Sequence, residues 1–528
     1  MNINNARTLH WLKQTLYPFI LGGALVLGFS PFNYWWICLL VFPLLIQHLE
    51  KQTSIRLSFW TGICFGLGLF GIGASWIYVS IHVYGHSPVW LAGLVTLLFV
   101  FILSLYPALT LALWKAIDLK SHPNPRPPAG EGTIITWQKI ILFAGIWTLM
   151  EWIRSYFLSG FPWLLLGYSQ TDGMLAGLAP MIGVYGLSFL VLIAAGLVLT
   201  IAQRSSGQII PWVSCTLLVA LAIVPYFLGQ IAWTSPTQKM VYAHLVQPNI
   251  SPDARWQYDH QDDIFKVLKE QTFTALASGQ PEQLQLVIWP EAAVPTPLPY
   301  SQPWLTQWDG LLKIRHASLI TGVLEMAENK QYYNAMLAVG QGNGDYAKRH
   351  LVPFGEYIPF ESLFGKLFNI MAVPRPATIA GAADQSLLHA FNTPHASIPV
   401  VSAICYEIAY PELVAHNARM GQAQYLITVS NDTWFGCSLG PKQHGQIARM
   451  RSMELGLPLL RATNSGLTFV TDQKGQITAE LPSFETATLS VKTMGYQGNT
   501  PLMYYGHGVI LALILLISLL TYLYRARK

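Results

Sequence analysis

The stretch Leu284-Gln-Leu-Val-Ile-Trp-Pro-Glu291 joins a short run of branched apolar residues to an acidic side chain. Such a run is typical of a buried β-strand. Ala396-Ser-Ile-Pro-Val-Val-Ser-Ala-Ile404 is a second run of this kind, and Cys405 follows it directly. Further short apolar runs alternate with helical stretches at 260–277 and 442–455. This alternation predicts an α/β domain with covered sheet faces, and it places Glu291 and Cys405 at strand ends, where catalytic groups tend to lie.

The rest of the chain has the composition of a membrane protein. Of its 528 residues, 52% are hydrophobic and only 11% are charged, and the mean hydropathy is +0.38, whereas soluble domains carry about 25% charged residues. A net charge of +5 gives no reason to expect a nucleic-acid partner. Segments able to cross about 30 Å of hydrocarbon are predicted at 14–30, 33–49, 57–81, 88–114, 134–158, 176–202, 209–232 and 506–524.

The basic residues of the loops indicate an orientation for these eight segments. Lys and Arg occur in alternate loops and again in the last four residues of the chain. Because cytoplasmic loops carry an excess of Lys and Arg, both termini are expected in the cytoplasm. The expected organisation is a membrane domain with seven transmembrane helices at 1–232, an extracytoplasmic α/β domain at 233–505, and a last transmembrane helix with a basic tail at 506–528.

Cys405 is the predicted nucleophile of the outer domain. The polar residues Tyr406 and Glu407 end the strand abruptly, which places the thiol at the mouth of the sheet. The backbone N–H of Tyr406 is then positioned to help bind an oxyanion. The other interpretation is a disulfide between Cys405 and Cys437, which would remove the nucleophile. Five cysteines without a Cys-x-x-Cys spacing indicate neither a disulfide framework nor a zinc site, and no metal is expected.

Two more residues complete a reactive set with Cys405. Two prolines soon follow Glu291, so a regular helix cannot begin there, and its carboxylate suits a general base that takes the thiol proton. Lys348 lies in a short basic run that is usually typical of a solvated surface. Directed inward, its ammonium could stabilise a tetrahedral oxyanion, with Glu356 holding the ammonium in place.

Three motifs carry a resemblance to a known family. Trp289-Pro-Glu291, Lys348-Arg-His-Leu-Val-Pro-Phe-Gly-Glu356 and Cys405-Tyr-Glu407 resemble, in this order, the Glu-Lys-Cys signatures of the nitrilase superfamily. The likeness covers nearly the whole chain and extends to Gly160-Phe-Pro-Trp-Leu-Leu-Leu-Gly-Tyr-Ser-Gln170 and Ser430-Asn-Asp-Thr-Trp-Phe-Gly436. The chain is therefore similar to the membrane-embedded branch of that superfamily, the apolipoprotein N-acyltransferases.

The resemblance implies an αββα sandwich in the periplasm, attached to the bacterial inner membrane, and a ping-pong acyl transfer without a cofactor. Cys405 would take an acyl chain from the sn-1 position of a phospholipid, such as phosphatidylethanolamine, as a thioester. The acceptor would be the α-amine of a diacylglyceryl-cysteine at the N-terminus of an apolipoprotein. A monomer is expected.

The resemblance also implies roles for single residues. Glu291 would be the base, Lys348 and the Tyr406 N–H the oxyanion donors, and Glu356 and Glu407 supporting carboxylates. Trp256 and Trp434 lie in resembling motifs and would contact substrate, although tryptophans of a membrane-facing domain are often interfacial anchors. The segment 360–373 is apolar and is either a lid that dips into the outer leaflet or an ordinary core helix.

Two other functions remain open at this point. A membrane-tethered amidase could use the same three residues, but hydrolysis needs only water as the second substrate, and eight helices exceed what an anchor requires. A transporter with an outer accessory domain would need ionisable or broken-helix elements in mid-membrane. The candidates for these elements are few and lie near predicted helix ends: His82, Glu151 and Asp172.

Overall fold

The computed structural model describes residues 3–120, 135–203, 211–251, 258–279, 283–328, 331–359, 378–419 and 421–527. Its contacts divide the chain into two compact units. Unit 1 consists of Met1–Ile231, Cys437–Gln446 and Tyr505–Lys528, and unit 2 consists of Ala232–Gly436 and Ile447–Tyr504.

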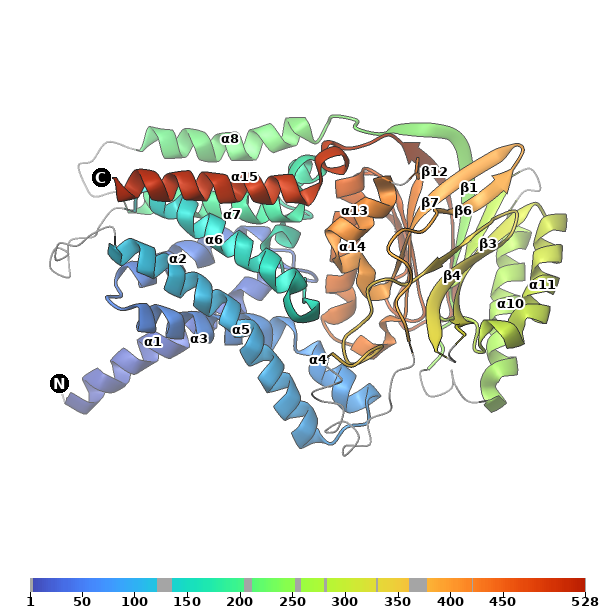
Figure 1. Ribbon diagram of the computed structural model, residues 1–528, viewed down its shortest axis with the longest axis horizontal. Helices are drawn as coiled ribbons and strands as arrows, with labels where there is room; N and C mark the ends of the chain where they lie inside the picture. Colours follow the sequence, from blue (N-terminus) through green and yellow to red (C-terminus); the bar gives the residue numbers. More distant parts are fainter. Residues whose placement is uncertain are drawn as a thin grey trace. The chain divides into compact units, whose positions relative to one another are not determined.

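Unit 1 is helical (Figure 1). Its main helices are α1 (Ile3–Leu25), α2 (Cys38–Glu50), α3 (Ile55–Gly73), α4 (Trp76–Val79), α5 (Val89–Lys120), α6 (Trp137–Tyr156), α7 (Ala179–Ala202), α8 (Trp212–Leu228) and, from Tyr505 on, α15 (Pro501–Ala526). Among the described residues, five helical stretches are long and apolar enough to cross a membrane: Ile55–Gly73, Val89–Lys120, Trp137–Ser159, Ala176–Ala202 and Pro501–Ala526. Shorter apolar helices occupy Gln14–Gly28, Trp35–Glu50 and Trp212–Leu228. Each of the eight predicted segments falls on an apolar helix, and the number of membrane crossings stays a prediction.

One predicted segment is not a single helix. The segment 57–81 is predicted as one stretch that crosses the membrane, but α3 ends at Gly73, and a short α4 and a π-helical turn at Ser80–Tyr84 follow. The break falls where Ala74 leaves the helical region (φ −114°, ψ 20°). A Cβ on Gly73 would lie 2.5 Å from Leu164 Cδ1, so the helix end is packed tightly against the 160–170 loop.

Glycines allow the first helices of unit 1 to approach one another closely. A Cβ on Gly22 of α1 would lie 1.9 Å from the carbonyl oxygen of Phe65 on α3. A Cβ on Gly62 of α3 would lie 2.4 Å from Cα of Ala108 on α5. Small residues at such crossings are the usual means by which helices pack in a membrane, where van der Waals contact replaces the hydrophobic effect.

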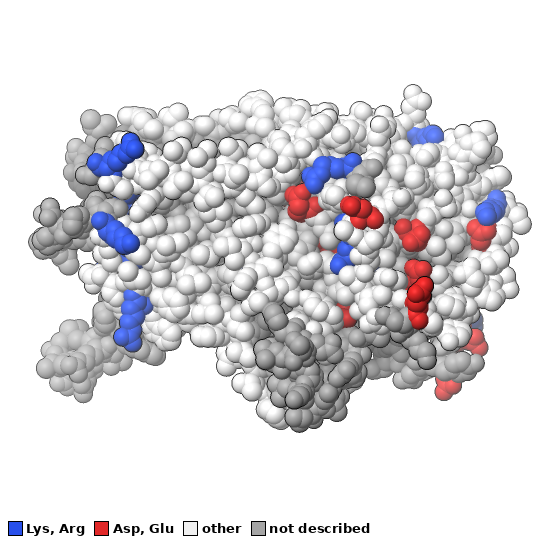
Figure 2. Space-filling view, viewed as in Figure 1, with Lys and Arg blue, Asp and Glu red and all other residues white. Residues whose placement is uncertain are grey.

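A buried ionic cluster joins four helices of unit 1. Asp118 on α5 lies 3.0 Å from Lys139 on α6 and 2.8 Å from Arg525 on α15, and Lys139 also lies 2.8 Å from Glu50 on α2. Figure 2 shows Lys and Arg side chains at the end of unit 1 where α15 finishes, and a broad surface without charged side chains over the adjoining helices of unit 1. This distribution suits helices whose outer faces contact lipid.

Unit 2 contains two six-stranded sheets. The first has the order β12-β1-β2-β3-β4-β5, and the second has the order β11-β10-β9-β8-β7-β6. The first sheet contains β1 (Ser235–Gln247), β2 (Leu284–Ile288), β3 (Ala317–Met326), β4 (Tyr332–Gly340), β5 (Asp345–Ala347) and β12 (Ala487–Gln497). The second contains β6 (Leu388–Thr393), β7 (Ala396–Ile404), β8 (Tyr425–Ser430), β9 (Leu459–Thr463), β10 (Phe469–Thr471) and β11 (Ile477–Glu480).

Each sheet has three parallel strands at its centre, β1-β2-β3 and β7-β8-β9, with antiparallel strands at its edges. One hydrophobic core contains residues of both sheets, among them Leu286 and Ile320 from the first and Val400 and Ile427 from the second, so the sheets pack face to face. The fully apolar runs of the central strands follow from burial on both faces.

Helices cover the outer faces of the two sheets (Figure 1). A second core packs α10 (Gln261–Ser278) and α11 (Leu298–Ile314) against the first sheet. The helices α13 (Pro411–Arg419) and α14 (Gly440–Leu455), the latter from Ile447 on within unit 2, lie beside the second sheet. Unit 2 is therefore the expected αββα sandwich.

Candidate active site

Glu291 lies just beyond the carboxyl end of β2. One residue past the strand, the N–H of Trp289 donates to the carbonyl of Ile320 at 2.9 Å, and the chain then turns at Pro290. A Cβ on Gly322 of β3 would lie 2.4 Å from the backbone nitrogen of Ala292 and 2.8 Å from Cα of Glu291. Glycine at position 322 therefore lets the Glu291 turn pack directly on the neighbouring strand, with Glu291 only 7% exposed.

Cys405 stands in a sharp turn at the carboxyl end of β7. Its φ of 52° is left-handed, a conformation that costs a non-glycine residue about 1–3 kcal/mol and that persists only when its surroundings impose it. The 3-10 turn Cys405–Ala409 begins there. Cys405 therefore lies at the carboxyl end of its strand, where the sequence predicts the nucleophile.

Glu407, fully buried, holds this turn in place. Its Oε2 accepts from the N–H of Ile404 at 2.8 Å. Its Oε1 accepts from the N–H groups of Arg349 and His350 at 2.7 and 3.2 Å, and from the hydroxyl of Tyr346 at 3.1 Å. One carboxylate therefore joins the cysteine turn to the segment that carries Lys348.

Lys348 follows β5 and points inward, with only 1% of its surface exposed. Its Nζ lies 2.9 and 2.8 Å from the two carboxylate oxygens of Glu356 and 3.4 Å from Oε1 of Glu291. Its backbone N–H donates to the carbonyl of Asn334 at 2.8 Å. The ammonium is thus held between two carboxylates, more closely by Glu356 than by Glu291.

Asn334, on β4, also belongs to this site, although no motif in the sequence predicts it. Its Nδ2 donates to Oε1 of Glu291 at 2.8 Å and to Oε1 of Glu356 at 3.0 Å. The other oxygen of Glu291, Oε2, accepts from the N–H of Asn431 beyond β8 at 2.8 Å. A buried amide inside a strand of apolar and aromatic residues is the signal that could have found it.

The charges of the cluster act on the thiol and on the lysine in defined directions. Burial and the Glu291 carboxylate raise the pKa of Cys405 above its usual value, against the opposing effect of Lys348. Burial alone would lower the pKa of Lys348, but the carboxylates of Glu356 and Glu291 outweigh it, and the pKa is raised. The resting site therefore holds a neutral thiol beside a charged ammonium, and the thiol needs a base before it can attack.

The remaining predicted site residues have different outcomes. Trp434 lies in the 3-10 turn Asp432–Phe435, on the loop that begins with Asn431, and it is 45% exposed. Trp256 and the segment 360–373 lie outside the described residues. Neither Cys405 nor Cys437 forms a disulfide in the structure, so the disulfide interpretation is wrong. Within the described part of the chain, no group of three His, Cys, Asp or Glu side chains could hold a metal ion.

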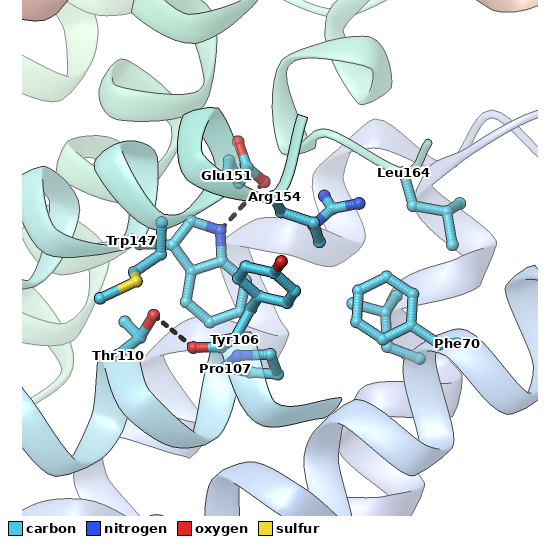
Figure 3. Close-up of a pocket in the computed structure, with 10 residues that line it drawn as sticks. Phe70, Tyr106, Pro107, Thr110, Trp147, Glu151, Arg154 and Leu164 are labelled. Atoms are coloured by element: carbon cyan, nitrogen blue, oxygen red, sulfur yellow. Dashed lines mark hydrogen bonds between the residues drawn. The ribbon is translucent and has the colours of Figure 1, made fainter. Parts of the chain in front are cut away.

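Glu151 and Arg154 of α6 are buried in unit 1 beside a small cavity (Figure 3). Glu151 accepts from Trp147 Nε1 at 3.1 Å and from the N–H of Leu166 at 2.8 Å, and Arg154 donates to two carbonyls of the Gly160–Gln170 motif at 2.7 and 2.6 Å. The cavity has a volume of about 20 Å³, enough for about one water molecule. Both side chains therefore hold the loop that follows α6 in place.

Comparisons with known proteins cover both units. The family profile described as "Apolipoprotein N-acyltransferase N-terminal domain" matches residues 21–197, and the profile described as "Carbon-nitrogen hydrolase" matches residues 245–495. Among solved structures, an amidase from Nesterenkonia sp. is 15% identical with a TM-score of 0.35, covering 52% of this chain and 96% of its own. A carbon-nitrogen hydrolase from Helicobacter pylori G27 is 17% identical with a TM-score of 0.33, covering 48% and 88%.

Curated relatives match over nearly the full length. The apolipoprotein N-acyltransferase of Azotobacter vinelandii is 36% identical over 502 residues, which cover 93% of this chain and 92% of that protein. The apolipoprotein N-acyltransferase of Shewanella oneidensis is 35% identical, covering 92% and 91%, and that of Pseudomonas aeruginosa PAO1 is 35% identical, covering 94% of each. With this identity over this share of both chains, the protein belongs to the apolipoprotein N-acyltransferase family.

Proposed function

We propose that the protein transfers an acyl chain from the sn-1 position of a phospholipid to the N-terminal amine of a diacylglyceryl-cysteine in apolipoproteins, through a thioester on Cys405. The observation that carries this proposal is the cluster of the buried Glu291 and Lys348 with the partly buried Cys405, in a chain whose other unit is built from apolar helices. The full-length likeness to proteins named apolipoprotein N-acyltransferase supports it.

In the first half-reaction, Glu291 takes the proton of the Cys405 thiol, and the thiolate attacks the ester carbonyl of the lipid. The tetrahedral oxyanion is stabilised by the ammonium of Lys348 and by the N–H of Tyr406. Collapse breaks the ester C–O bond, the proton on Glu291 passes to the departing oxygen, and a lysophospholipid leaves with a free hydroxyl. The acyl group remains on Cys405 as a thioester.

In the second half-reaction, the neutral α-amine of the acceptor attacks the thioester carbonyl. Glu291 takes one amine proton, the C–S bond breaks, and the proton returns to the Cys405 sulfur. The product is an amide, and the enzyme is back in its starting protonation state. Trp256 and Trp434 are the proposed substrate contacts, and Glu356 and Glu407 act through the groups they hold. Phosphatidylethanolamine is the proposed donor, and the protein is proposed to act as a monomer.

The proposed location is the bacterial inner membrane, with residues 1–232 and 506–528 forming eight transmembrane helices, cytoplasmic termini, and residues 233–505 in the periplasm. The excess of Lys and Arg in alternate loops supports this orientation. Membrane-impermeant maleimide should label single cysteines placed in 233–505 in intact spheroplasts, and it should label a cysteine placed after position 525 only after lysis. Labelling of the C-terminal cysteine in intact spheroplasts would reverse the orientation.

Intact-mass measurement of the purified chain tests the chemistry. After incubation with phosphatidylethanolamine, the wild type should carry the mass of one acyl group, and Cys405→Ala should carry none. Addition of a diacylated peptide with a free N-terminal amine should discharge the adduct onto the peptide. An adduct that is lost equally fast to water without the peptide would indicate an amidase-like hydrolase, and no adduct at all would refute the thioester route.

A further inference from the structure

The two carboxylates of the site share one neutral partner. Asn334 uses both hydrogens of its carboxamide, one for Oε1 of Glu291 at 2.8 Å and one for Oε1 of Glu356 at 3.0 Å. Lys348 donates to the same two oxygens. Each of these oxygens therefore receives two donors, one from a cation and one from the amide, in a place that is almost closed to water: Asn334 is 6% exposed and Glu291 7%.

The orientation of the Asn334 carboxamide follows from its neighbours. The flipped amide would place Oδ1 against two carboxylate oxygens, an arrangement of acceptors without a donor. In the observed orientation Oδ1 is buried and accepts no hydrogen bond. An unsatisfied buried carbonyl oxygen destabilises the folded protein. In exchange, both N–H groups of the carboxamide are directed at the two carboxylates.

The remaining donors show how the two acids differ. Oε2 of Glu356 accepts from the N–H of Val352 at 2.7 Å and lies 2.8 Å from Lys348 Nζ, so both oxygens of Glu356 are held by two donors. Oε2 of Glu291 accepts from the N–H of Asn431 at 2.8 Å. The other titratable groups that act on the cysteine of this cluster are Lys348 and Asp432, and Asp432 is paired with Arg461 at 2.8 Å.

We infer that Asn334 is a positioning residue that keeps Glu291 and Glu356 ionised together, so that Glu291 is free of a proton whenever a substrate arrives. This inference rests on the proposed role of Glu291 as the base. Two carboxylates that share one ammonium would otherwise bind a proton more readily, because like charges in a buried site disfavour double ionisation. A protonated Glu291 could accept a proton neither from Cys405 nor from the incoming amine.

Asn334→Leu tests this inference because leucine keeps the size of the side chain and removes both donors. The acidic limb of the pH profile is the range in which kcat/KM for acyl transfer falls as the pH is lowered. In Asn334→Leu the profile should keep its shape, but this limb should move to higher pH by about one unit, so that kcat/KM falls about tenfold on it. At pH values above the limb, the loss should be much smaller. Raising the pH should therefore rescue the variant, which loss of structure alone would not allow.

Gln247→Leu is the matched control. Gln247 is likewise buried. It donates both amide hydrogens, to the carbonyls of Pro482 and Glu485 at 2.8 Å each, and its Oε1 accepts no hydrogen bond. Its acceptors are neutral, so its substitution should lower the Tm without moving the acidic limb. If Asn334→Leu fails to fold, Asn334→Asp keeps the shape and should move the limb further, because it replaces the donors with a third acid.

An acidic limb in Asn334→Leu that coincides with that of the wild type, alongside a lowered Tm, would show that Asn334 is merely structural and would overturn the inference. A limb that moves equally in Gln247→Leu would do the same. Failure of the proposed function is a separate outcome: the wild type itself would then form no acyl adduct on Cys405 at any pH.

Discussion

Glu291→Gln and Lys348→Met should change the acidity of the Cys405 thiol in opposite directions, although both should abolish acyl transfer. Burial is the first cause that raises the pKa of Cys405, and the charge of Glu291 is the second, while the charge of Lys348 lowers it. The glutamine substitution removes a cause that raises the pKa, and the methionine substitution removes a cause that lowers it. Catalysis is lost in the first variant for want of a base and in the second for want of an oxyanion donor.

The size of the effect follows from Coulomb's law. As a general scale, two unit charges about 5 Å apart at an effective dielectric constant of about 20 interact by roughly 3 kcal/mol, which is about two pKa units. The Lys348 ammonium lies 3.4 Å from the Glu291 carboxylate and already offsets part of that charge. We therefore expect a shift of about one unit each way, which is about tenfold more thiolate in Glu291→Gln and about tenfold less in Lys348→Met.

The rate of alkylation by iodoacetamide reports the thiolate fraction. The full chain in detergent micelles is treated at a series of pH values, and the masses of the cysteine-containing peptides are followed with time. Cys437 is exposed and serves as the internal reference in every sample. Glu480→Gln, at an exposed position outside the site, should react like the wild type. A Cys405 thiol that reacts more slowly in Glu291→Gln than in the wild type would refute the reasoning, because Glu291 would then be promoting the thiolate in the resting enzyme.

Three further substitutions test the support of the site and of unit 1. Burial raises the pKa of Glu407, and the backbone N–H donors around it oppose this effect. The contribution of Glu407 to stability is therefore greatest below its ordinary pKa of 4.5 and falls as the pH rises through the raised pKa. The difference in unfolding free energy between wild type and Glu407→Gln should shrink in thermal unfolding from pH 4 upward, and a constant difference would contradict this. Gly322→Ala should lower kcat by tenfold or more with a smaller change in KM, since its Cβ would meet Ala292 at 2.4 Å and displace the Glu291 turn; full activity would show that the turn tolerates the shift. Asp118→Asn should destabilise unit 1 by about 3–5 kcal/mol, because it leaves buried cations such as Arg525 without their acid, and an unchanged Tm in detergent would exclude a stabilising role for the cluster.

The sequence allowed Glu291 and Cys405 to be predicted as residues at strand ends because both depend on local information. A short run of branched apolar residues, either continuous or alternating with polar ones, indicates a strand. The first polar residue after the run indicates where the strand ends. The same is true of α10 and α14, which were expected at 260–277 and 442–455 and occupy Gln261–Ser278 and Gly440–Leu455. The apolar helices of unit 1 were equally accessible, since hydropathy over about 20 residues is a local property.

What could not be predicted depends on contacts between distant parts of the chain. The pairing of β1 with β12 joins Val241 to Thr493, and no local pattern specifies such a partner. In the basic run after β5, composition could not decide which side chain points inward: Lys348 is buried in the acid cluster, whereas Arg349 extends to Asn417 on α13. Asn334 was missed for the same reason, because its role exists only once β4 lies beside the turns that carry Glu291 and Lys348.

The arrangement of charges also explains how a buried site can bear a developing oxyanion. At rest the cluster has two carboxylates, Glu291 and Glu356, one ammonium and a neutral thiol, and so carries one net negative charge. In the proposed mechanism the thiol proton moves to Glu291 as the oxyanion forms, so the net charge is unchanged and no bare charge has to be created in a medium of low dielectric. Protonation of Glu291 weakens the longest contact of the Lys348 ammonium, which is 3.4 Å from Nζ to the Glu291 carboxylate. The contacts of Nζ with the two oxygens of Glu356, at 2.8 and 2.9 Å, remain. The same proton transfer that activates the sulfur therefore releases the lysine toward the oxyanion, and Glu356 keeps the ammonium in position while its second partner changes from carboxylate to substrate.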